Sequence, residues 1–349
     1  MVGTRRGTRR SGAPDLVRGG VVVVGTGAWG TLLAILFARA GLTTTLLART
    51  EAEAQELRRA GENRRFLPGV MLPSAVHVMA ERCTLRDAAL VVLAVPAQRM
   101  RENLRALAPD LPPAAALLSA AKGIELESGL RMSQVIAAEL GPRSGPVLAL
   151  SGPNLSGEIA RGLPAATVIA AGHGGLTAAR AVQRLLSSER LRVYTSSDLI
   201  GVELGGAMKN VIAIACGICD GLGYGHNARA GLLTRGLAEM TRLAVAAGGR
   251  ARTLAGLAGL GDLVATVASA SSRNYALGLA LGRGTPLAEA EARLGHIAEG
   301  VATTRAALTL ARTLGVELPI TEQLAAVLAG SCSPAEGARA LMVRAPARE

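Results

Sequence analysis

The chain has 349 residues, of which half are hydrophobic and only 18% are charged. This apolar content is enough for two globular cores and excludes an intrinsically disordered protein. The net charge of +12 would suit a nucleic-acid ligand, but the body of the chain has no long basic run. A phosphorylated substrate and cofactor would account for part of the positive charge.

The N-terminal region, residues 1–19, is basic and rich in Gly, Ser and Thr. It has no hydrophobic periodicity, so we predict a disordered basic tail. The uncharged run of residues 21–38 makes this end resemble a secretory signal, but Gly25, Gly27 and Gly30 interrupt that run. Because no other uncharged apolar stretch is long enough to span a bilayer, we expect a cytoplasmic protein without membrane insertion.

Residues 21–30 predict a dinucleotide-binding loop. Four valines, Val21–Val24, indicate a strand, and the glycines of a G-x-G-x-x-G pattern follow it directly. This spacing lets the chain turn sharply, brings the backbone close to a pyrophosphate and lets the next helix, residues 31–39, pack near the strand. The free N–H groups at the start of that helix attract phosphate. We therefore expect the loop to hold NAD(P)H through Gly25, Gly27, Ala28, Trp29 and Gly30.

The residues that follow the second predicted strand, residues 43–47, indicate whether NAD or NADP is preferred. An acidic residue for the ribose 2′-hydroxyl is usual there in NAD sites, whereas this chain has Arg49. A guanidinium suits a 2′-phosphate, so we expect NADPH to be accepted; stacking of Arg49 on the adenine is the alternative. Thr50 and Glu53 have the spacing of a capping box for the following helix. Glu51 and Glu53 are therefore interpreted as structural.

Short apolar runs alternate with amphipathic segments up to about residue 197. This alternation predicts a mostly parallel sheet with helices on both faces, a Rossmann-like doubly wound α/β domain over residues 20–197. A further helix is expected over residues 176–186. The remaining predicted strands are Leu90–Val95, Ala115–Ser119, Val147–Leu150, Ala166–Ala170 and Leu191–Tyr194.

Lysine is rare in this chain, because only Lys122 and Lys209 among the 38 Lys and Arg residues are lysine. Arginine serves equally well where only a positive charge is needed, but it does not give up its proton. The pKa of a partly buried lysine, in contrast, falls toward neutrality. Lys122 follows a strand end, where open α/β sheets bind their ligands, and Lys209 lies in a segment that contains glycines. We interpret both as active-site residues; two solvated surface lysines are the alternative.

After residue 198 the pattern becomes helical, and we predict an all-α domain over residues 198–349. Cys216 and Cys219 form a C-x-x-C pair without a second ligand pair nearby. We interpret them as small buried helix residues and expect no metal. The predicted helices are Leu199–Cys219, Ala230–Ala247, Ser272–Leu281, Val301–Leu314 and Thr321–Ala329.

Over residues 20–344 the chain resembles the bacterial NAD(P)-dependent glycerol-3-phosphate dehydrogenases. The matching stretches are Gly25–Gly30, Asn63–Gly69, Ala94–Pro96, Ala121–Glu125, Ser151–Pro153, Gly201–Ala215, Gly256–Asp262, Ser272–Asn274 and Glu299–Gly300. Those of the second half distinguish this family best from other dehydrogenases with a similar nucleotide domain. The resemblance implies a second domain like the helical domain of 6-phosphogluconate dehydrogenase. It also implies the reversible reduction of dihydroxyacetone phosphate to sn-glycerol 3-phosphate for phospholipid synthesis.

The resemblance further implies the roles of single residues. Lys209 matches the general acid/base that protonates the C2 oxygen as hydride arrives, and Lys122 matches a contact to substrate and cofactor. Asp262 would hold Lys209 or the substrate hydroxyl. The other implied substrate residues are Gly152 and Asn154 and, for the phosphate, Ser272, Arg273 and Asn274. The other implied cofactor residues are Ser156, Arg273, Ile297 and Glu299.

Two alternative functions remain open from the sequence. A β-hydroxyacid dehydrogenase pairs a similar nucleotide domain with a helical domain and uses a lysine, but its substrate carries a carboxylate where a phosphate is expected here. A non-catalytic NAD(P)-sensing protein would need the cofactor loop, but it would not need both lysines and Asp262. The expected partners are a small phosphorylated substrate and, from the resemblance, a second copy of the chain in a homodimer. Nucleic acid is not expected.

Overall fold

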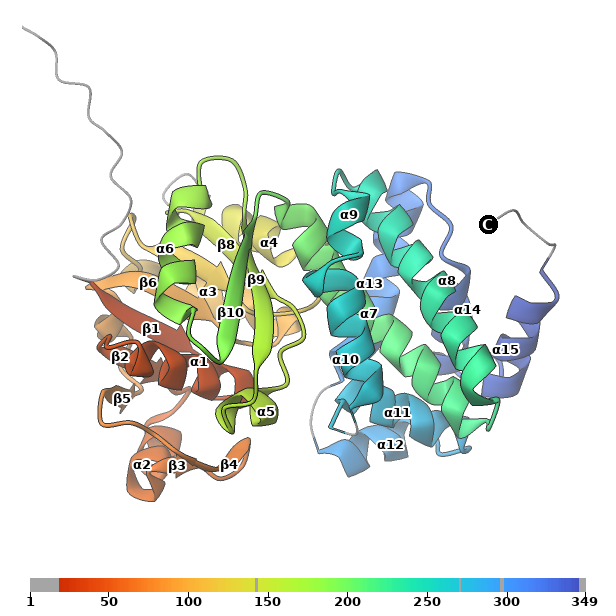
Figure 1. The fold of residues 1–349 in the computed structure, drawn as a ribbon, viewed down its shortest axis with the longest axis horizontal. Coiled ribbons are helices and arrows are strands. Elements are labelled where there is room, and N and C mark those ends of the chain that lie inside the picture. Colours follow the sequence, from red (N-terminus) through yellow and green to blue (C-terminus); the bar gives the residue numbers. More distant parts are fainter. Residues whose placement is uncertain (1–18, 142–143, 270, 296–297, 345–349) are drawn as a thin grey trace, which may run out of the picture.

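The computed structural model describes residues 19–141, 144–269, 271–295 and 298–344. Figure 1 shows a sheet with helices on both faces, followed along the chain by a bundle of helices. The predicted N-terminal tail, apart from Gly19, lies outside the described residues.

One large sheet contains the strands β1 (Gly20–Val24), β2 (Thr44–Leu47), β5 (Val76–Met79), β6 (Ala88–Leu93), β7 (Ala116–Ser119), β8 (Val147–Ser151), β9 (Ala165–Ala171) and β10 (Leu191–Ser196). Their order across the sheet is β10-β9-β8-β7-β6-β1-β2-β5. Neighbours run parallel, except that β8 and β9 pair antiparallel. The predicted mostly parallel sheet is confirmed.

Helices cover both faces of the sheet and make up the second half of the described chain. The helices of the first half are α1 (Ala28–Arg39), α2 (Glu51–Ala60), α3 (Met100–Leu107), α4 (Met132–Leu140), α5 (Ser156–Ala160) and α6 (Leu176–Leu186). Those of the second half are α7 (Leu199–Gly221), α8 (Gly225–Ala246), α9 (Ala251–Leu254), α10 (Asp262–Ala268), α11 (Arg273–Gly282), α12 (Leu287–Leu294), α13 (Glu299–Leu314), α14 (Pro319–Leu328) and α15 (Pro334–Met342). The predicted change to helices after residue 198 is confirmed for the described residues.

The all-valine strand β1 shows why the sheet is covered on both faces. Val21 and Val23 pack into one core together with Phe37 of α1. Val22 and Val24 pack into the core on the opposite face, which α3 and α4 help to form. Because successive side chains of a strand point to opposite faces, a continuous apolar run requires two covering layers.

Several short elements escaped prediction. Strand β5 has four residues at the edge of the sheet, with buried and more exposed positions in alternation, so its apolar pattern is too short to stand out. A two-stranded hairpin, β3 (Glu62–Asn63) with β4 (Leu67–Met71), was missed for the same reason. A π-helical turn, η5 (Leu257–Gly261), precedes α10, and its glycines gave no helical signal.

Helix α7 is the central helix of the second half. Two described segments, α7 and Ala251–Ala268, are long and apolar enough to cross a membrane by composition alone. Other parts of the protein bury 83% of the most apolar stretch of α7, against 39% for the second segment, so α7 is a core helix. Cys216 and Cys219 are free and buried in it, as predicted. Burial raises the pKa of the Cys216 thiol to about 12, which disfavours a reactive thiolate.

Helices α7 and α11 touch through their backbones. Gly217 and Gly221 of α7 face Gly278 and Gly282 of α11, and a Cβ atom at any of the four would meet backbone atoms at 2.6 Å or less. Only glycine permits this approach. The contact holds the first turn of α11 in a fixed position relative to α7.

We expect Gly278→Ala to lower the free energy of unfolding by about 1–3 kcal/mol, because the new methyl group forces two packed backbones apart. Its Cβ would lie 2.0 Å from the Ile214 carbonyl oxygen. Urea unfolding followed by circular dichroism measures the effect. Gly231→Ala in α8 is the matched control: nothing lies within 4 Å of its Cβ position, so it should stabilise by about 0.5–1 kcal/mol. Equal effects of the two variants would contradict the account of this contact.

Candidate active site

The glycine loop between β1 and α1 has the shape that a dinucleotide requires. Gly25 has a φ of +108°, and its Cβ would lie 2.6 Å from the Ala94 carbonyl oxygen. A Cβ at Gly30 would lie 2.0 Å from the Gly25 carbonyl oxygen. At Gly27, in contrast, no atom lies within 4 Å of the Cβ position. The loop therefore packs tightly against the sheet and leaves open space in front of Gly27, which fits a pyrophosphate at the start of α1.

Asn63 fixes this loop from the side. Its amide nitrogen donates to the Thr26 carbonyl oxygen at 2.7 Å and to the Thr31 hydroxyl at 2.8 Å. Its amide oxygen accepts from the Phe66 N–H at 3.1 Å. The Asn63 side chain is buried, so the motif that begins at Asn63 supports the cofactor loop.

The other predicted cofactor residues of the first half lie around the loop. Ala28 and Trp29 form the first turn of α1, and the buried indole nitrogen of Trp29 has no hydrogen-bond partner among the described residues. Ser156 is the first residue of α5, whose Ile159 packs on α1. Arg49 is exposed just beyond the end of β2. Ala28 and Trp29 therefore lie within α1, and Ser156 begins a helix that packs against it.

The predicted capping box of α2 forms only in part. The Thr50 hydroxyl accepts from the Glu53 N–H at 3.2 Å, as predicted. The Glu53 carboxylate, however, accepts from the Arg49 N–H at 3.1 Å and from the Thr26 hydroxyl, and not from the Thr50 N–H. The expectation of a full box was wrong, because Glu53 reaches past the helix start to the glycine loop.

The two lysines meet on one buried carboxylate. The Lys122 ammonium lies 2.6 Å from Oδ2 of Asp262, and the Lys209 ammonium lies 3.1 Å from Oδ1 of the same residue. The side chain of Asp262 is only 3% exposed, while those of Lys122 and Lys209 are 17% and 11% exposed. The structure thus brings together three residues that are 140 positions apart at most.

Three separate segments deliver these side chains. Lys122 follows the carboxyl end of β7, and Lys209 lies in the middle of α7. Asp262 begins α10 directly after the π-helical turn η5, a kind of element that is frequent at functional sites. Gly205 of α7 lets η5 approach, since its Cβ would lie 2.7 Å from the Ala258 carbonyl oxygen. Tight packing of η5 on α7 therefore sets the position of Asp262.

Burial and mutual charge shift the pKa values of this cluster. Burial lowers the pKa of Lys209 to about 8, against the attraction of Asp262 and together with the repulsion of Lys122. Burial acts to raise the pKa of Asp262, but the Lys122 and Lys209 ammonium groups hold it below its usual value. At neutral pH the cluster therefore combines an ionised aspartate with a lysine that is poised to exchange a proton.

Thr266 is a member of the cluster that the sequence reasoning missed. Its buried hydroxyl accepts from the Lys209 ammonium at 2.7 Å and lies 3.3 Å from Oδ1 of Asp262. The spacing of four residues from Asp262 on α10 places both on one helix face. That spacing was the available signal once Asp262 had been identified.

The loop after β8 forms one wall beside Lys122. The Gly152 carbonyl oxygen accepts from the Lys122 ammonium at 2.9 Å, and Gly152 has a φ of +136°. Asn154 donates to the Thr167 hydroxyl at 3.1 Å, while its buried amide oxygen has no partner among the described residues. The Ser151 hydroxyl is buried without a partner in the same set. The loop that contacts Lys122 through Gly152 therefore also carries buried polar atoms that suit a polar ligand.

The start of α11 holds the three residues predicted for phosphate. The Ser272 hydroxyl caps the helix by accepting from the Tyr275 N–H at 3.3 Å, and Arg273 is exposed at the first helical position. The Asn274 side chain is buried and committed: it donates to the Asn210 amide oxygen at 2.9 Å and accepts from the Gly300 N–H at 3.0 Å. A phosphate contact of Asn274 would therefore involve its backbone N–H or the second hydrogen of its amide nitrogen.

Glu299, at the start of α13, connects the two halves of the chain. Its carboxylate accepts from the Ala97 N–H at 3.1 Å. Burial raises the pKa of Glu299, and the Ala97 N–H and the charges of Arg273, Lys209 and Lys122 oppose that rise. Glu299 is thus within electrostatic reach of the lysine cluster and of the predicted phosphate residue. Ile297 lies outside the described residues.

A second buried contact joins the halves at the start of α7. The Glu203 carboxylate accepts from the Ser133 N–H and from the Ser133 hydroxyl, both at 2.7 Å. It also forms an ion pair with Arg131 at the start of α4. Since α7 carries Lys209, this contact ties the position of Lys209 to the sheet domain.

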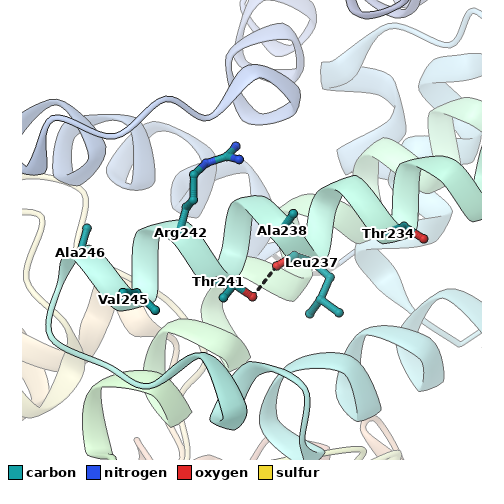
Figure 2. A pocket seen from close by; sticks show the side chains of 7 residues that line it. All are labelled: Thr234, Leu237, Ala238, Thr241, Arg242, Val245 and Ala246. Carbon is teal, nitrogen blue, oxygen red and sulfur yellow. Dashed lines mark hydrogen bonds between the residues drawn. The ribbon is translucent and has the colours of Figure 1, made fainter. Parts of the chain in front are cut away.

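A separate shallow groove lies on the outer face of α8 (Figure 2), where the Thr241 hydroxyl donates to the Leu237 carbonyl oxygen at 2.8 Å. Neither lysine lines it, so we assign it no part in the site. The residues that line the groove are Thr234, Leu237, Ala238, Thr241, Arg242, Val245 and Ala246.

Among the described residues no group of three or more His, Cys, Asp or Glu could hold a metal ion.

Comparisons with known proteins agree with this geometry. A sequence profile described as NAD-dependent glycerol-3-phosphate dehydrogenase N-terminus matches residues 20–176, and the corresponding C-terminus profile matches residues 198–339. The chain is 46% identical over 330 residues to the glycerol-3-phosphate dehydrogenase (NAD(P)+) of Carboxydothermus hydrogenoformans, covering 94% of this chain and 98% of that protein. The enzyme of the same name from Caulobacter vibrioides is 47% identical over 310 residues, covering 89% and 92%.

A solved structure is similar as well. The glycerol-3-phosphate dehydrogenase of Coxiella burnetii superposes with a TM-score of 0.89 at 35% sequence identity. The match covers 94% of this chain and 99% of that chain. The sheet domain and the helical domain are therefore both shared with that enzyme.

We expect Asp262→Asn to lower the pKa of Lys209 further below 8, because the variant removes the attraction that favours the charged ammonium and leaves the repulsion of Lys122. The chain has only two lysines, so NMR of the ¹³C-dimethylated protein resolves each one. Lys209→Arg assigns the signals. An unchanged or raised pKa of Lys209 in the Asp262→Asn protein would show that the carboxylate does not control this amine.

Proposed function

The chain belongs to the NAD-dependent glycerol-3-phosphate dehydrogenase family, and from this premise we propose how its residues carry out the reaction. The enzyme interconverts dihydroxyacetone phosphate and sn-glycerol 3-phosphate with NAD(P)H as the hydride donor. The observation that carries the mechanism is the buried Lys209, held between Asp262 and Thr266 with a pKa of about 8.

Lys209 is the proposed general acid/base. In reduction it donates a proton to the C2 oxygen, and in oxidation it takes that proton back. A pKa of about 8 lies close to working pH, so both protonation states are accessible. The ammonium also stabilises the negative charge that develops on the C2 oxygen, and its partial burial strengthens this interaction. Arginine would supply the charge without a transferable proton.

Lys122 and Asp262 are proposed to position the reacting groups. Asp262 is hydrogen-bonded to Lys122 and forms an ion pair with Lys209, so it fixes the distance between the two ammonium groups. The Gly152 carbonyl oxygen holds the second side of Lys122. A substrate bound against the two lysines is thereby oriented before proton transfer, which lowers the entropic part of the barrier.

The start of α11 is proposed to bind the substrate phosphate. Its backbone N–H groups carry partial positive charge, and the Arg273 guanidinium supplies a fork that matches phosphate oxygens. The Ser272 hydroxyl, which accepts from the Tyr275 N–H as the helix cap, still has its proton to donate. The charges of Arg273 and Lys209 both lower the pKa of Glu299 against the effect of its burial.

The glycine loop is proposed to hold the cofactor, whose nicotinamide supplies the hydride when it is bound. Gly25 and Gly30 let the loop pack tightly, Gly27 leaves room for the pyrophosphate, and Ala28 and Trp29 begin the helix that faces it. Lys122, Ser156, Arg273, Ile297 and Glu299 remain proposed contacts, and Arg49 remains the proposed reason for accepting NADPH. The catalytic residues lie at the junction of two proposed domains, residues 20–197 and 198–349.

Two further statements are proposals that rest mainly on the family resemblance. We propose that two copies of the chain form a homodimer. We also propose a cytoplasmic location. The burial of α7 argues only against a membrane span in that helix, because its most apolar stretch is already covered by protein.

We expect the purified chain to oxidise NADPH or NADH with dihydroxyacetone phosphate about two orders of magnitude faster than with short 2- and 3-keto acids, because the phosphate residues would stay unpaired with a smaller acid. Absorbance at the nicotinamide band measures the rate. Faster turnover of a keto acid would favour the β-hydroxyacid dehydrogenase alternative, and no turnover at all would favour a sensing role.

The kcat/KM for reduction should fall as pH rises through about 8, since reduction needs the protonated Lys209.

A further inference from the structure

The Glu53 carboxylate lies between the glycine loop and the end of β2. It accepts from the Thr26 hydroxyl inside the loop and from the Arg49 N–H just after the strand. Thr26 is buried, and Glu53 is half-buried in the first turn of α2. A helix-capping role does not require either contact. The side chain instead bridges the two segments that border the adenosine half of a dinucleotide site.

This position is the one where NAD sites place a negative charge. In such sites an acidic residue at the end of the second strand accepts a hydrogen bond from the ribose 2′-hydroxyl. This chain has Arg49 and Thr50 at the strand end. The Glu53 side chain returns from the helix to the same stretch of backbone, because its Oε2 accepts from the Arg49 N–H at 3.1 Å. A carboxylate is therefore present where the sequence pattern had suggested only a cation.

We propose that Glu53 sets the preference between NADH and NADPH. Its carboxylate accepts a hydrogen bond from the 2′-hydroxyl of NADH and repels the 2′-phosphate of NADPH. This inference rests on the proposed cofactor site at the glycine loop. Arg49 acts in the opposite direction, but its exposed guanidinium is screened by solvent, whereas two hydrogen bonds fix the carboxylate.

The neighbouring charges do not cancel that of Glu53. Glu51, in the same helix turn, forms an ion pair with Arg58 and accepts from Gln55. The Arg58 guanidinium also donates to the Val78 carbonyl oxygen at 2.7 Å, which holds it on the opposite side of α2. Glu51 therefore has the same charge as Glu53 and lies in the same helix turn, but its contacts do not reach the glycine loop.

The test is direct binding of NADH and of NADPH to the full-length chain without substrate, measured by calorimetry. For Glu53→Gln we expect NADPH to bind about tenfold more tightly, since a tenfold change corresponds to the loss of one close like-charge contact. NADH should bind about two- to threefold more weakly, because the amide oxygen still accepts from the 2′-hydroxyl but without charge assistance. Glu51→Gln is the matched control and should change neither dissociation constant by more than about twofold.

Two further variants separate charge from structure. Thr26→Val removes a hydrogen bond of Glu53 and keeps its charge, so it should weaken both cofactors by the same factor. Glu53→Asp keeps the charge and should retain the wild-type preference. An unchanged NADH-to-NADPH ratio in Glu53→Gln would overturn the inference, as would the same ratio change in Glu51→Gln or Glu53→Asp. If the wild type binds neither cofactor, the proposed cofactor site itself fails.

Discussion

The proposed active site depends on one buried carboxylate that holds two ammonium groups. Burying an unpaired charge is costly, so Asp262 is stable in the core only with its lysines, and the lysines are stable at this depth only with Asp262. The two positive charges exceed the single negative one. This excess keeps the pKa of Asp262 low, lets burial depress the pKa of Lys209, and leaves net positive charge for a phosphorylated, oxygen-rich substrate.

The fold serves this cluster by bringing distant segments into contact. Lys122 lies just beyond the carboxyl end of β7, and Lys209 lies on α7, the core helix of the helical half. Backbone contacts at glycines place α11 and the π-helical turn η5, which leads into α10, against α7. Glu203 and Glu299 connect the halves through Ser133 and Ala97. A shift of one half relative to the other would therefore separate Lys122 from Asp262, since Lys209 and Asp262 both belong to the helical half.

Much of this arrangement was predictable from the sequence, and the remainder has physical reasons. The glycine spacing directly after a strand predicted a dinucleotide-binding loop, and the scarcity of lysine drew attention to Lys122 and Lys209. Edge strand β5 was not predictable because an alternation of buried and more exposed positions over only four residues carries little pattern. The reach of Glu53 to Thr26 and the commitment of Asn274 to Asn210 and Gly300 depend on tertiary contacts. Residue spacing predicts the helix to which a side chain belongs, but it does not predict which distant residues that side chain contacts.

The most direct test of the central claim, proton transfer by Lys209, is the turnover of Lys209→Arg. Arginine keeps the positive charge beside Asp262 but does not release a proton at working pH. We predict that kcat falls by about a thousandfold or more, while the affinity for NAD(P)H measured without substrate changes little. Substantial turnover by the Lys209→Arg enzyme would contradict the mechanism and leave the family assignment in place.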